Sequence, residues 1–166
     1  MAKYYQMCQA SLDAAERFQQ YRERVLKYAS KVRRALILNC AVPQDKITLF
    51  KCNEKTDEER QNVPVDEEIL PTLQRVLERP ESDGYWHLGI QITLSQMHFV
   101  SLVLCFSEDG GSPIVRIGQE GKGEAIDLDD QQALASFCES IGDIVVAAYG
   151  DTRASTSRSI GFGATY

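Results

Sequence analysis

The sequence predicts an α+β domain in which an antiparallel β-meander of about four to five strands is flanked by three helices. Two observations favour this class. Apolar residues recur at helical spacing near both ends of the chain and in a short middle segment, whereas residues 84–128 alternate in the manner of strands between turn residues. Consecutive strands joined by short turns pair as antiparallel neighbours, which predicts the meander.

A long N-terminal helix is predicted from Ser11 to about Leu38, because its residues separate into two sides at about 100° per residue. The apolar side comprises Phe18, Val25, Ala29, Val32 and Leu36. The opposite side forms a basic stripe of Arg17, Arg24, Lys27, Lys31 and Arg34. The helix is therefore expected to dock by its apolar side and to present positive charge to water.

The remaining elements follow in order along the chain. A short middle helix is predicted from about Leu70 to Arg79, ended by Pro80, and a C-terminal helix from Asp129 or Asp130 to Gly150. The predicted strands cover residues 46–52, 85–94, 97–106, 114–117 and 124–128.

The domain is expected to span residues 1–150. Residues 151–166 are rich in Ser, Thr and Gly, which predicts a flexible C-terminal tail. The alternative is that Ile160, Phe162 and Tyr166 dock onto a partner or a second subunit.

The hairpin of the two longest strands provides the candidate binding surface. If Ser95 and Gln96 form a two-residue turn, Trp86 lies opposite Cys105, and one face of the sheet is half polar and half apolar. Because exposing four large apolar side chains is costly, a helix or another subunit is expected to cover this half-apolar sheet face. Its candidate binding residues are Tyr85, His87, Gln91, His98, Val100, Leu102, Leu104 and Phe106.

No motif predicts catalysis, a metal or a cofactor. The five cysteines are widely spaced and form no zinc signature. The segment 118–124, GQEGKGE, lacks the spacing and the Ser or Thr of a phosphate-binding loop, and Asp127, Asp129 and Asp130 are adequately explained as helix-capping residues. No GxSxG motif is present to anchor a catalytic triad.

Charge is distributed unevenly along the chain. Residues 1–38 carry eight Lys or Arg against three Asp or Glu, a net charge of +5, and the remainder carries ten against 21, a net charge of −11. The acidic remainder would repel phosphates, so nucleic-acid binding through the basic stripe is the weakest functional hypothesis. No apolar run approaches the roughly 20 residues of a membrane span, which predicts a cytoplasmic protein without membrane contact.

These observations favour a non-enzymatic protein-binding module of the inhibitor, immunity, chaperone or adaptor type. Its partner would be another protein or a second copy of the chain, bound through the half-apolar sheet face. The alternative is a small-ligand or enzyme pocket lined by Tyr85, His87, Gln91 and His98, in which a histidine would act as acid or base.

Overall fold

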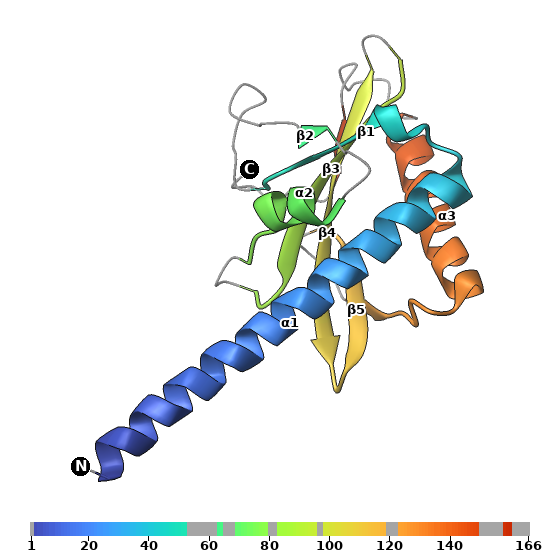
Figure 1. The fold of residues 1–166 in the computed structure, drawn as a ribbon. Coiled ribbons are helices and arrows are strands. Elements are labelled where there is room, and N and C mark those ends of the chain that lie inside the picture. The colour runs from blue at the N-terminus through green and yellow to red at the C-terminus, as the bar shows by residue number, and fades with distance from the viewer. Residues whose placement is uncertain are drawn as a thin grey trace.

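A computed structural model describes residues 2–52, 63–64, 69–79, 83–95, 98–118, 123–149 and 158–160. It has three α-helices packed beside one sheet, and the first helix projects far beyond the rest of the molecule (Figure 1). The helices are α1 (Ala2–Cys40), α2 (Ile69–Val76) and α3 (Gln131–Ala148). The strands are β1 (Ile47–Phe50), β2 (Val63–Pro64), β3 (Trp86–Thr93), β4 (Phe99–Asp109), β5 (Ser112–Ile117), β6 (Glu124–Ala125) and β7 (Arg158–Ile160).

The predicted α+β class and antiparallel meander are confirmed. The strand order is β2-β1-β3-β4-β5-β6, and every neighbouring pair along this path is antiparallel. The expectation that the second hairpin strand is central is also confirmed, because β4 pairs with β3 on one edge and with β5 on the other.

The predicted hairpin register is wrong by one residue. Trp86 lies opposite Phe106, not Cys105, and Thr93 lies opposite Phe99. The Leu94 N–H donates to the His98 carbonyl at 2.8 Å, so three residues separate this pair where a two-residue turn was predicted. Because side chains alternate between faces with a period of two, this shift moves every side chain of β4 to the other face.

The corrected register gives the sheet one strongly apolar face, which forms the core. This face comprises Trp86, Leu88, Ile90 and Ile92 of β3 and Val100, Leu102, Leu104 and Phe106 of β4. Residues from α1, α2 and α3 belong to the same core, so all three helices cover this one face. The four apolar side chains of β4 are therefore covered within the chain, and the predicted face that combined them with His87 and Gln91 does not exist.

The helices begin and end for identifiable local reasons. The carboxylate of Asp130 caps α3 by accepting hydrogen bonds from the backbone N–H groups of Gln132 and Ala133, as predicted. The α1 helix starts nine residues before the predicted Ser11. It ends at Cys40, where Ala41 takes a left-handed conformation with φ of 52°.

The C-terminal segment contributes a short strand. Residues 158–160 form β7, which pairs in parallel with residues 100–102 of β4. The prediction of a flexible tail over residues 151–166 otherwise falls on residues outside the described ranges, as do Phe162 and Tyr166.

Candidate functional site

The second face of the sheet is buried around His87, Ser101 and Cys105 although it is rich in polar groups. It presents His87, Gly89, Gln91 and Thr93 of β3 beside residues 99, 101, 103 and 105 of β4. The exposed fraction is 3% for His87 and 0% for Cys105. Gly89 allows a close approach here, because a Cβ atom at this position would lie 2.5 Å from the ring of Phe50.

A charged cluster lies at one end of this face, around Asp83. One carboxylate oxygen of Asp83 is 2.8 Å from His87 Nε2 and 2.8 Å from Arg116 Nη2, and the other accepts the Tyr85 N–H at 3.0 Å. Burial acts to raise the pKa of Asp83, but these hydrogen bonds outweigh it and lower the pKa. Because an ionised carboxylate can only accept, Nε2 of His87 carries the proton.

Arg116 and Cys105 complete the cluster. The Arg116 guanidinium lies 4.0 Å from the centre of the Tyr85 ring, and its Nε donates to the Gly118 carbonyl at 2.9 Å. The Cys105 thiol donates to the same carbonyl at 3.3 Å. Cys105 also lies directly opposite His87, a pairing that the incorrect register concealed.

This arrangement suits a structural network better than a catalytic one. Burial raises the pKa of Cys105 to about 11, so the sulfur stays protonated near neutral pH and is a poor nucleophile. His87 is too deeply buried for a substrate to reach it in this conformation. Within the described ranges, no three His, Cys, Asp or Glu side chains converge as a metal site would require.

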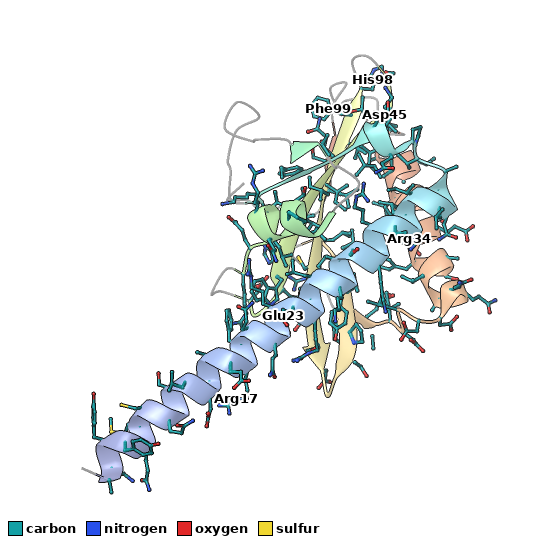
Figure 2. The ribbon with its side chains drawn as sticks, in the orientation of Figure 1. Arg17, Glu23, Arg34, Asp45, His98 and Phe99 are labelled. Carbon is teal, nitrogen blue, oxygen red and sulfur yellow. The ribbon has the colours of Figure 1, made fainter. Side chains whose placement is uncertain are left out.

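The four predicted polar pocket residues do not form one pocket, although Tyr85 and His87 both contact Asp83. Tyr85 is half-buried beneath Arg116, and Gln91 is half-buried in the middle of β3. His98 is exposed at the far end of the hairpin (Figure 2), where its Nδ1 lies 2.7 Å from the Ser95 hydroxyl. The candidate residues Val100, Leu102, Leu104 and Phe106 lie on the opposite face, in the core.

Sequence reasoning missed Asp83 and Arg116. The sequence gives no distinct signal for Arg116, because an arginine between Val115 and Ile117 also fits a strand with one face exposed to water. Asp83 lies in the connection before β3, and its distance from Arg116 along the sequence does not indicate that the two side chains meet. Only the fold brings the two side chains together.

A hollow of about 240 Å³ lies between β5 and α3. Its lining mixes apolar side chains, Phe137 and Ile144 among them, with Glu124 and Ser140. It is smaller than the roughly 300–1,000 Å³ typical of ligand pockets. The hollow therefore gives little support to the small-ligand hypothesis.

The basic stripe of α1 is partly neutralised by the acidic body. Arg24 donates to both carboxylate oxygens of Glu108, at 3.1 and 2.6 Å, and Tyr28 donates to the same carboxylate at 3.0 Å. Lys31 Nζ lies 2.7 Å from Asp129. Arg17, Lys27 and Arg34, the remaining members of the stripe, are exposed.

The N-terminal half of α1, residues 2–20, extends away from the body, and we call it the α1 tip (Figure 2). All of its side chains are exposed except that of Cys8, which is half-buried. The exposed fractions of its large apolar residues are 73% for Tyr4, 71% for Tyr5, 63% for Met7, 65% for Leu12 and 44% for Phe18. Phe18, predicted to be on the docking side, is 44% exposed and meets the body at Trp86, 5.7 Å between ring centres, and at Arg79, whose guanidinium lies 5.8 Å from the centre of the Phe18 ring.

These apolar residues spread over a broad side of the tip, about 160° of the helix surface at 100° per residue. The positions Tyr4, Cys8, Ser11, Ala15 and Phe18 alternate at intervals of four and three residues, which is the spacing of a helix-packing seam. Tyr5, Met7, Leu12 and Ala14 flank this seam, while the opposite side holds Gln6, Asp13, Gln20 and similar polar residues. The tip is thus an amphipathic helix whose apolar side is uncovered.

Comparison of the chain with protein-family models, with curated proteins and with solved structures found no match. Among the described residues, no helix has both the length and the apolarity needed to cross a membrane.

Proposed function

We propose that the protein is a non-enzymatic protein-binding module that docks its partner through the α1 tip. The main observation in support is the uncovered apolar side of this helix, on which five large apolar residues are between 44% and 73% exposed. A helix with one apolar side is stable in water chiefly when that side packs against something. An exposed apolar patch of this extent is typical of a protein interface.

The same proposal places the interface on α1 and not on the sheet, where the sequence suggested it. Val100, Leu102, Leu104 and Phe106 have exposed fractions of 0 to 1%, so a partner has no access to them in this fold. The α1 tip, in contrast, is reachable along its whole length of about 28 Å.

The competing hypotheses have weaker support. An enzyme or ligand site around His87 would need an accessible acid, base or nucleophile, whereas the groups around Asp83 are buried and hydrogen-bonded to one another. Nucleic-acid binding would need a continuous basic stripe, whereas Arg24 and Lys31 already pair with carboxylates.

Site-specific photo-crosslinking tests the proposal. A benzoylphenylalanine placed at Leu12, on the apolar side of the tip, should form a covalent adduct with a protein when the chain is expressed in its native host. The matched control carries the same group at Gln6, on the polar side, and should give little adduct. Absence of a protein adduct at Leu12, or equal yield at both positions, would contradict the proposal.

A further inference from the structure

We infer that the partner of the α1 tip is a second copy of this chain, bound as an antiparallel pair of helices. This inference rests on the proposed function, because it uses the same apolar side of α1. It adds the identity of the partner, the direction of the two helices and the residues that meet.

The seam of the tip is the continuation of a seam that is already buried inside the body. Continuing the same spacing from Phe18 leads through Arg22 to Val25, Ala29, Val32 and Leu36. Those last four residues have exposed fractions of 0 to 1%. One side of a single helix therefore packs against the body from Val25 onward and is uncovered before Tyr21.

This continuity fixes the direction of a partner helix. The body lies on the seam side of α1, so a helix lying along the tip seam must stop where the body begins, near Phe18 and Trp86. In a parallel pair, the two bodies would have to lie side by side between helix axes only about 8–10 Å apart, where they do not fit. In an antiparallel pair, the N-terminus of the second copy lies near Phe18, so its helix ends before it meets the first body.

The side chains of the seam also suit an antiparallel pair. In such a pair, the column Tyr4, Ser11 and Phe18 of one copy faces the column Cys8 and Ala15 of the other. Tyr4 then lies opposite Ala15, and Cys8 lies opposite Ser11. The first contact places a large residue against a small one, and the second joins two small residues. Both allow the helices to pack closely.

The charges favour the same arrangement. The tip contains Lys3 and Arg17 against Asp13 and Glu16, so its net charge is zero, and the whole net charge of −6 lies in the rest of the chain. Two neutral tips meet without repulsion, and the antiparallel direction keeps the two acidic bodies at opposite ends. A membrane-binding helix would instead be rich in Lys and Arg on its polar side.

The available area is adequate for a dimer. Aromatic residues offer roughly 150–250 Å² each. At the observed exposures, the five large apolar residues present on the order of 600 Å² per copy. A standard interface buries about 800 Å² per partner, which the flanking residues of the tip bring within reach.

Light scattering after gel filtration gives the first test, using the purified full chain. The wild type should have twice the chain mass at high micromolar concentration. Leu12→Glu should raise the dissociation constant roughly tenfold or more, because it places charge in the apolar interface. The control Gln6→Glu adds the same charge on the polar side and should remain dimeric.

Disulfide trapping tests the direction of the helices. Tyr4→Cys and Ala15→Cys, each in a Cys8→Ser background, should form a mixed disulfide when combined. Neither should form its own disulfide, because identical positions lie roughly 16 Å apart along an antiparallel pair. Circular dichroism checks that each variant remains folded.

Three results would overturn the inference: a wild-type monomer at every concentration, a Leu12→Glu variant that dimerises as well as wild type, or efficient disulfides of Tyr4→Cys with itself. A monomer that co-sediments with phosphatidylcholine–phosphatidylglycerol vesicles would also overturn it. An adduct at Leu12 that contains only another protein would refute self-association but leave the proposed function standing.

Discussion

The two halves of α1 have the same pattern of apolar residues and opposite environments. Val25, Ala29, Val32 and Leu36 are buried against the body, whereas Tyr4, Ser11, Ala15 and Phe18 follow the same spacing in the tip and are exposed. An amphipathic pattern thus indicates which side of a helix is buried, but it does not indicate which part of the chain or which partner covers that side. The body half is buried against other segments of the same chain, and for the tip we propose burial against a second copy.

The largest expected effect is on folding stability, and it should differ sharply between substitutions in the two halves of α1. Val32→Asp places a carboxylate at a site with 0% exposure and should cost several kcal/mol of folding free energy or prevent folding. Leu12→Asp should change the free energy of unfolding of the monomer by less than about 0.5 kcal/mol, because Leu12 is 65% exposed there. Urea unfolding at low protein concentration measures both, and a large cost for Leu12→Asp in the monomer would remove the contrast.

A substitution on the sheet face that points away from the helices should lower folding stability and leave dimerisation unchanged. Asp83→Asn replaces the carboxylate that Arg116 and His87 share, so it should destabilise the fold by about 2–3 kcal/mol, discounted for the partial exposure of Asp83. Chemical unfolding gives the cost, and light scattering gives the mass. Loss of dimerisation in a folded Asp83→Asn variant would place the interface elsewhere.

Arg33 offers a prediction of the opposite sign within the buried half. Arg33 is 7% exposed, its Nε and Nη2 find no hydrogen-bond partner among the residues that the structure describes, and burial lowers its pKa. Arg33→Met keeps a long apolar side chain and removes the buried charge, so it should stabilise the fold by about 1–3 kcal/mol. A lower melting temperature for Arg33→Met would show that the charge has a favourable role in the fold.

The smallest effect concerns the ion pair where α1 meets β4. The hydrogen bonds from Arg24 lower the pKa of Glu108. A lowered folded-state pKa stabilises the fold above the unfolded pKa of about 4.3, and this stabilisation is lost as pH falls through the folded value. Because Arg24 is 46% exposed, water screens this ion pair and its contribution to stability should be small.

Glu108→Gln tests this ion pair. The variant should be slightly less stable than wild type at pH 7, and the difference should shrink toward pH 3. A difference that persists unchanged at pH 3 would indicate lost packing instead of lost charge.

Periodicity predicted most of the fold because burial of one side leaves a direct trace in the sequence. The helices around Val32, Leu73 and Phe137 and the strands around Leu49, Ile90 and Leu102 were all found in this way. The boundaries were less accurate, since α1 begins at Ala2, nine residues before the predicted Ser11.

The candidate site was predicted less well, for one specific reason. A two-residue turn was assumed where three residues separate Leu94 and His98, and a shift of one residue exchanged the two faces of β4. That error placed Leu102 and Phe106 on a binding surface and separated His87 from Cys105. Local patterns alone do not determine register, because both faces of β4 are apolar enough to be buried.

Hydrogen exchange at two protein concentrations tests the central claim most directly, because it compares the two halves of α1 in one molecule. If the tip packs against a second copy, amides of residues 5–19 should become protected at high micromolar concentration and exchange freely after dilution. Amides of residues 25–36 should stay protected at both concentrations. Exchange of the tip that is equally fast at both concentrations would contradict self-association through α1.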